Sequence, residues 1–109
     1  MQDCIFCKIA NGEIPKEFVY QDDDVLIFDD IAPLKPVHML VIPRVHVTET
    51  MAVEDHLLFA KLFEAVQKVA KDKNLDTGGF RIVMNGGGAQ AVDHLHIHVM
   101  GPYAKAAAL

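Results

Sequence analysis

Three histidines alternate with apolar residues near the end of the chain, in residues 94–98 (HLHIH). Side chains alternate between the two faces of a β-strand, so this pattern predicts a strand with three imidazoles on one face. Leu95, Ile97 and Val99 would line the other face and pack against a core. Imidazoles serve as nucleophiles, acids, bases or metal ligands, which makes the histidine face a candidate functional site.

The composition is that of an ordinary globular domain, with 109 residues, 51% of them hydrophobic and 23% charged. A chain of this size is typical of a single domain, and we expect one over residues 1–109. The net charge of −5 argues against binding DNA or RNA by phosphate neutralisation. The sequence contains neither an apolar run near the ~20 residues that span a bilayer nor a signal-peptide pattern. We therefore expect a cytoplasmic protein without a membrane partner.

Hydrophobic periodicity predicts strands and helices along the chain. The predicted strands cover residues 18–21, 25–28, 38–42, 80–84 and 94–99. A short helix is predicted over residues 4–10, and a long one over residues 53–75, where apolar residues recur at helical spacing. Most connections between strands are too short for parallel crossovers. The expected fold class is therefore α+β, with helices packed on an antiparallel sheet.

A run of glycines, residues 86–88, follows one predicted strand and precedes the histidines. Glycine allows backbone N–H groups to approach an anion closely, so this loop could cradle a phosphate, although it could also be a flexible turn. An imidazole beside a phosphate suggests nucleophilic attack at phosphorus. The histidine row could instead hold a catalytic zinc, but same-face neighbours lie ~6.5–7 Å apart at Cα, so three converge less readily than two.

The two cysteines, Cys4 and Cys7, have C-x-x-C spacing. In a reducing compartment this spacing favours a metal site or a redox pair over a structural disulfide. A tetrahedral zinc site would need two further ligands, for which His46 and His94 are the candidates. The alternative is a pair of reduced or buried thiols.

Residues 94–100 (HLHIHVM) match the His-φ-His-φ-His-φ-φ signature, in which φ is apolar, and the chain resembles the histidine triad (HIT) family. Residues 4–15, 28–33, 36–43 and 83–87 resemble its Hint-type branch. The resemblance extends over nearly the whole chain. It implies the HIT fold, a five-stranded antiparallel sheet with two helices, and a homodimer with a ten-stranded sheet.

The same resemblance implies an activity, which is hydrolysis of purine nucleoside phosphoramidates such as adenosine 5′-phosphoramidate. Related branches cleave dinucleoside polyphosphates or transfer nucleotidyl groups. By resemblance, His96 is the nucleophile that takes the nucleotidyl group, and His38 and His94 support it. The groups expected at the phosphate are His98, Asn85 and the backbone near Gln90 and Ala91.

The remaining site residues are also implied by the resemblance. Asp30 would accept the ribose hydroxyls. The base pocket would be walled by Phe6, Phe28, Ile31 and Leu40. A structural zinc, as in zinc-bearing members, would be held by Cys4, Cys7, His46 and His94.

Two features depart from the family pattern. Hint-type phosphoramidases commonly carry a serine, whose hydroxyl assists the leaving group, where this chain has Ala91. The loop from Asn85 to His94 is also shorter than usual. These departures leave a second hypothesis open, in which the chain is a nucleotide-binding or zinc-stabilised interaction module with weak catalysis.

Overall fold

The computed structural model, which describes residues 3–106 and 108–109, shows five strands in one antiparallel sheet. The strands are β1 (Tyr20–Gln21), β2 (Val25–Asp29), β3 (Val37–Pro43), β4 (Arg81–Val83) and β5 (Ile97–Gly101). They are ordered β1-β2-β3-β5-β4, and every neighbouring pair is antiparallel. The helices are α1 (Ile5–Ala10), α2 (Leu57–Asp72) and α3 (Leu75–Gly78), with a 3-10 turn η1 (Thr50–Ala52). The expected α+β class and five-stranded sheet are confirmed.

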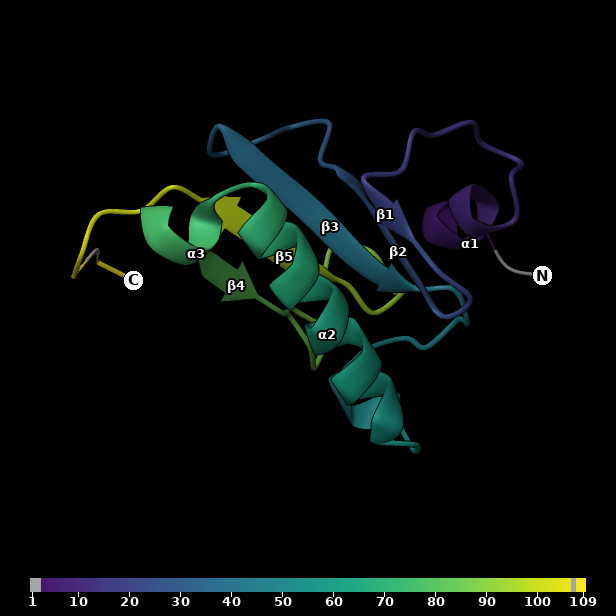
Figure 1. The fold of residues 1–109 in the computed structure, drawn as a ribbon. Helices are drawn as coiled ribbons and strands as arrows, with labels where there is room; N and C mark the ends of the chain where they lie inside the picture. Colours follow the sequence, from purple (N-terminus) through teal and green to yellow (C-terminus); the bar gives the residue numbers. More distant parts are fainter. Residues whose placement is uncertain (1–2, 107) are drawn as a thin grey trace.

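Both faces of the sheet are covered, because alternate residues of the central strands belong to different apolar clusters. One cluster joins Val25 and Ile27 of β2 to α2, and the other joins Leu26 and Phe28 to α1. In Figure 1, α2 runs along the sheet while α1 lies near the β1–β2 hairpin. The sheet thus separates a large core on the α2 side from a smaller one on the α1 side. Within the described residues, no helix is both long and apolar enough to span a membrane.

The predicted histidine strand is correct in its alternation and wrong in its start. Leu95, Ile97 and Val99 all join the core on the α2 side, as the period of two predicts. However, β5 begins only at Ile97. The N–H of Leu95 donates to the carbonyl of Val47 over 2.6 Å, so this residue bonds a loop instead of a neighbouring strand.

The predicted helix over residues 53–75 is shorter than expected at both ends. The helix α2 begins only at Leu57, with His56 in the N-cap position, and the side chain of Asp55 accepts the N–H of Leu57 over 3.0 Å. At the other end, Asn74 adopts a left-handed conformation with φ of 59°, which separates α2 from α3. Residues 76–78, which follow the predicted helix, therefore belong to a second short helix, α3.

Gly79 packs against the backbone of the C-terminal segment, and its carbonyl accepts the N–H of Tyr103 over 3.0 Å. We expect Gly79→Ala to destabilise the protein by ~3 kcal/mol or more. Its φ is +86°, and an added Cβ would lie 2.1 Å from the carbonyl oxygen of Tyr103. Gly12→Ala is the matched control, since Gly12 has φ of +79° but no described atom within 4 Å of an added Cβ. Urea unfolding should show a loss of only ~1 kcal/mol for this control. Equal losses in both variants would contradict the steric explanation.

Candidate functional site

His96 is a buried imidazole, and a backbone hydrogen bond determines which of its two nitrogens carries the proton. Its Nδ1 lies 2.8 Å from the carbonyl oxygen of His94, and a carbonyl can only accept, so Nδ1 carries the proton. The lone pair of neutral His96 is therefore on Nε2. The Phe6 ring packs edge-on against this imidazole, with centroids 5.2 Å apart, and only 5% of His96 is exposed. A buried, oriented imidazole with a free lone pair is suited to nucleophilic attack.

His98 is oriented by a chain of hydrogen bonds that starts at a backbone amide. The N–H of Leu34 donates to Nδ1 of His38 over 3.0 Å, so the proton of neutral His38 is on Nε2. This Nε2 lies 2.9 Å from Nδ1 of His98, which must then accept. The result is that Nε2 of His98 carries a proton and can donate to a ligand. Oδ2 of Asp30 lies 3.4 Å from the same His38 nitrogen.

Burial lowers the pKa of His98 below its ordinary 6.5, and the neighbouring His96 and His38 lower it further, while Asp30 opposes the shift. The hydrogen-bond chain gives the same direction, because a second proton on His98 would face the N–H of His38. His98 is therefore neutral and a single donor at neutral pH.

The lowered pKa of His98 predicts that the folded protein loses stability as pH falls below 6.5, because the unfolded chain then binds the proton more readily. The loss should develop between pH 6.5 and the lower pKa of the folded state. Urea midpoints at pH 7.5 and 5.5 measure it. In His98→Gln this part of the dependence should disappear, and an unchanged pH dependence in that variant would contradict the assignment.

Four residues from distant parts of the chain bring their ligand atoms together on the α1 side of the sheet. Sγ and Nδ1 atoms of this cluster lie within 4.8 Å of one another, and the members are Cys4, Cys7, His46 and His94. Nδ1 of His94 is 3.3 Å from Sγ of Cys4, and Nδ1 of His46 is 3.2 Å from Sγ of Cys7. Tetrahedral zinc with Zn–S of ~2.3 Å and Zn–N of ~2.0 Å separates such atoms by ~3.5 Å. The four residues therefore fit zinc.

The surroundings of His94 also favour metal binding. Its Nε2 lies 2.8 Å from the carbonyl oxygen of Pro43, so Nε2 carries the proton and Nδ1 faces the cysteines with its lone pair. Burial and the adjacent Cys4 thiol raise the pKa of Cys7 to about 11 without a metal. Zinc would have to displace the thiol protons on binding. With four protein ligands and no open position, zinc here would be structural.

His94, His96 and His98 do not together form a candidate metal site among the described residues. Among the described residues, the groups that could hold an ion are the cysteine–histidine cluster and the set Asp30, His38 and His98. In the second set, Nε2 of His38 carries a proton because its Nδ1 accepts from Leu34, so it has no lone pair for a cation. The geometry therefore disfavours the catalytic zinc hypothesis for the histidine row.

Three of the four expected base-pocket residues lie together. Phe6, Phe28 and Leu40 are buried in one cluster, with the Phe6 and Phe28 rings edge-to-face at 5.7 Å. Ile31 is not part of that cluster and is 89% exposed in the loop after Asp30. Since Phe6 also contacts His96, the cluster joins the aromatic residues to the histidines.

The glycine loop is held by side chains that sequence analysis did not identify as partners. The N–H of Gly87 donates to Glu49 over 2.8 Å, and the N–H of Gly88 donates to the side chain of Gln90 over 3.0 Å. These two amides are therefore not available as the phosphate cradle that the glycine run suggests. Asn85 and the backbone at Ala91 remain the candidate phosphate contacts from this loop. No pattern in the sequence indicates Glu49, because its partners are backbone atoms.

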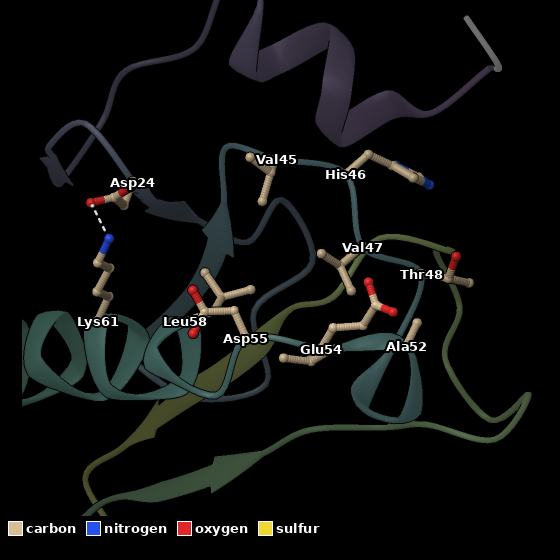
Figure 2. Close-up of a pocket in the computed structure, with 11 residues that line it drawn as sticks. Asp24, Val45, His46, Val47, Thr48, Ala52, Glu54, Asp55, Leu58 and Lys61 are labelled. Carbon is tan, nitrogen blue, oxygen red and sulfur yellow. Dashed lines mark ion pairs between the residues drawn. The ribbon is translucent and has the colours of Figure 1, made fainter.

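A hollow of about 490 Å³ lies between α2 and the segment around residues 45–55, and the three histidines of residues 94–98 do not line it. Figure 2 shows its lining, with an ion pair between Asp24 and Lys61 on one side and Glu54 near the centre. His46 is the residue that this hollow shares with the cysteine–histidine cluster.

The family comparison covers most of the chain. A family model described as the HIT domain matches residues 11–105. Protein HitA of Neisseria gonorrhoeae is 46% identical over 105 residues, which cover 93% of this chain and 97% of that protein. A 14 kDa zinc-binding protein of Brassica juncea is 47% identical over 105 residues, covering 91% of this chain and 92% of that protein.

Solved structures give the same result. A HIT family hydrolase from Legionella pneumophila Philadelphia 1 superposes with a TM-score of 0.86 at 40% identity, covering 94% of this chain and 95% of that one. A HIT family hydrolase from Clostridium thermocellum superposes with a TM-score of 0.92 at 33% identity, covering 100% of this chain and 98% of that one. Family model, sequence relatives and fold agree with the histidine arrangement, and this chain belongs to the HIT domain family.

Proposed function

We propose that this protein hydrolyses the P–N bond of purine nucleoside 5′-phosphoramidates through a nucleotidyl intermediate on His96. The observation that carries the proposal is the fixed tautomer of His96, whose Nδ1–H donates to the His94 carbonyl and leaves the Nε2 lone pair free. Two solved relatives are named HIT family hydrolases, which supports a hydrolase in general. The phosphoramidate substrate and the Hint-type branch rest on the sequence resemblance.

The proposed reaction has two displacements at phosphorus. In the first, Nε2 of His96 forms a bond to phosphorus and the P–N bond of the substrate breaks. The departing nitrogen keeps the bonding electron pair and takes a proton from solvent water, so it leaves as the amine. In the second, water attacks the same phosphorus and loses a proton to solvent, the bond to His96 breaks with its electron pair returning to Nε2, and the nucleoside monophosphate is released. The Nε2–H of His98 donates to a phosphoryl oxygen as negative charge builds there. Asn85 and the backbone near Gln90 and Ala91 complete the phosphate contacts.

The ribose and the base would bind beside the phosphate. Asp30 would accept the ribose hydroxyls, with one carboxylate oxygen held by the N–H of Ala32 over 2.9 Å. The purine would lie against the wall formed by Phe6, Phe28 and Leu40, with Ile31 contributing from its exposed loop. Because Ile31 is free of the core, it can move toward the base without disturbing the fold.

The direct test compares turnover on adenosine 5′-phosphoramidate with turnover on a diadenosine polyphosphate. We expect release of ammonia and AMP from the first to be faster. Faster cleavage of the second would replace the proposal with dinucleoside polyphosphate hydrolysis, and transfer to an added nucleotide acceptor would indicate a nucleotidyl transferase. AMP binding without turnover on any of these substrates would favour the interaction module that Ala91 suggests, since alanine has no hydroxyl for the leaving group.

We infer that the cysteine–histidine cluster binds a structural zinc ion. The support is the fit of Cys4, Cys7, His46 and His94 to tetrahedral distances, and the name of the Brassica juncea relative, a zinc-binding protein.

Both cysteines are free thiols, as expected in the reducing cytoplasm, where we propose that the protein acts. Cell fractionation that finds the protein outside the cytoplasm would contradict that location.

We propose that two copies join through β4, the strand at one edge of the sheet. Exposed apolar side chains lie at this edge, since Ile82 of β4 is 39% exposed and Phe80, just before the strand, is 43% exposed. Pairing β4 with its copy would extend the sheet across the dimer and cover an edge that otherwise invites association. Ile82→Glu should shift the protein from dimer to monomer in sedimentation experiments, while Ile31→Glu in a distant exposed loop should leave the dimer intact. A monomeric wild type would contradict this proposal.

A further inference from the structure

One short segment contacts both the candidate zinc cluster and the loop that leads to the histidines. We call it the strap, residues 46–52. His46 joins the cysteine cluster, and the carbonyl of Val47 accepts the N–H of Leu95 over 2.6 Å. Farther along, the hydroxyl of Thr50 lies 3.0 Å from the sulfur of Met84. The strap therefore follows the connection between β4 and β5 from one end to the other.

Glu49 makes the central contact of the strap, and both of its carboxylate oxygens are used. Oε1 accepts the N–H of Gly87 over 2.8 Å, and Oε2 accepts the N–H of Met51 over 2.8 Å. Hydrogen bonds to an ionised carboxylate are short and about twice as strong as neutral ones. The Glu49 side chain thus bridges two backbone segments of the chain, the 3-10 turn η1 and the glycine loop.

The loop is shaped to receive this carboxylate. A Cβ at Gly86 would lie 2.9 Å from Oε1 of Glu49, so a larger residue there would push the carboxylate away. Gly87 and Gly88 have φ of +65° and +97°, values that favour glycine. The glycine run therefore has a structural role that does not involve a phosphate, because it allows the loop backbone to approach the Glu49 carboxylate closely.

The structure assigns Glu49 as a positioning residue that holds the loop carrying Asn85 and Ala91 against the histidines. This inference rests on the proposed function, in which Asn85 and the backbone near Ala91 contact the substrate phosphate. Glu49 itself donates nothing to the substrate and acts only through Gly87. The loop has no regular secondary structure between β4 and β5, so its position depends on such side-chain bridges. Gln90 supplies a second one, from Gly88 to Asp93.

The experiment compares Glu49→Ala and Glu49→Gln with Glu54→Gln in the full-length protein. AMP affinity is measured by calorimetry, and exchange of the Gly87 amide is followed by NMR. Glu49→Ala should weaken AMP binding about tenfold and speed exchange of that amide, as expected for loss of a charge-assisted hydrogen bond. Glu49→Gln keeps one acceptor oxygen and should fall between alanine and wild type. Glu54 serves as the matched control, because it is an exposed glutamate that lines the hollow beside α2 and makes no bond to the glycine loop. Its replacement should change neither quantity.

Two results would overturn the inference. Unchanged Gly87 exchange in Glu49→Ala would show that the bridge does not hold the loop in solution. Faster exchange with unchanged AMP affinity would show that the loop position does not matter for the ligand. By contrast, a wild type that binds no AMP would contradict the proposed function itself, while Gly87 exchange would still report whether the bridge forms. A circular dichroism spectrum equal to that of wild type confirms that each variant is folded.

Discussion

Replacing His96 with alanine is expected to lower turnover of adenosine 5′-phosphoramidate by at least ~10⁴-fold. The reason is that the only atom proposed to bond to phosphorus is lost, and no other imidazole can substitute for it. His94 presents Nδ1 to the cysteines and donates Nε2–H to Pro43. His98 points a lone pair at His38 and keeps a proton on its other nitrogen. The measurement is steady-state release of AMP, compared with a wild-type preparation.

Two controls separate loss of chemistry from loss of structure in His96→Ala. The variant leaves the buried carbonyl of His94 without its partner, so a stability loss of ~1–3 kcal/mol is expected in urea. AMP should still bind, because the phosphate contacts from His98 and Asn85 remain. Turnover within tenfold of wild type in a folded, AMP-binding variant would show that His96 is not the nucleophile. His98→Ala should retain measurable activity, since it removes a donor and not the attacking atom.

The sequence predicts the sheet well, because strands that pack one face on a core alternate apolar residues with a period of two. The alternation of Leu95, Ile97 and Val99 is enough to place them in the core on the α2 side. The errors occur where a single local interaction overrides the pattern. The helix α2 begins later than its periodicity suggests, where the side chain of Asp55 accepts the N–H of Leu57. At its other end, Asn74 breaks the helix by a backbone conformation that no apolar pattern records.

The candidate site could be predicted only in part, for a related reason. Residue types indicate which side chains can bind metal or attack phosphorus, and Cys4, Cys7, His46 and His94 do come together as their chemistry suggests. The roles of the imidazoles, however, depend on which nitrogen carries the proton. That is set by the carbonyls of Pro43 and His94 and by a backbone amide. Every residue supplies such backbone groups, so their position is a property of the fold.

Replacing both cysteines with serine is expected to abolish zinc binding and to lower stability by ~3 kcal/mol or more, or roughly 10–20 °C in Tm. Zinc would join the start of α1 to residues just before β5, and so close a loop over most of the chain. The hydroxyl of serine does not replace a thiolate as a zinc ligand. Metal analysis of Cys4→Ser/Cys7→Ser and of wild type gives the zinc content, and thermal unfolding gives the stability.

Chelation distinguishes a structural zinc from a simple packing role of the thiols. Treatment with a strong chelator should bring wild type close to the stability of the double variant and leave the variant unchanged. Turnover should fall in parallel, because His94 supplies both a zinc ligand and the carbonyl that orients His96. Zinc that persists in the double variant would mean that histidines alone hold it, and the hypothesis of a catalytic metal at the histidine row would then replace the structural one.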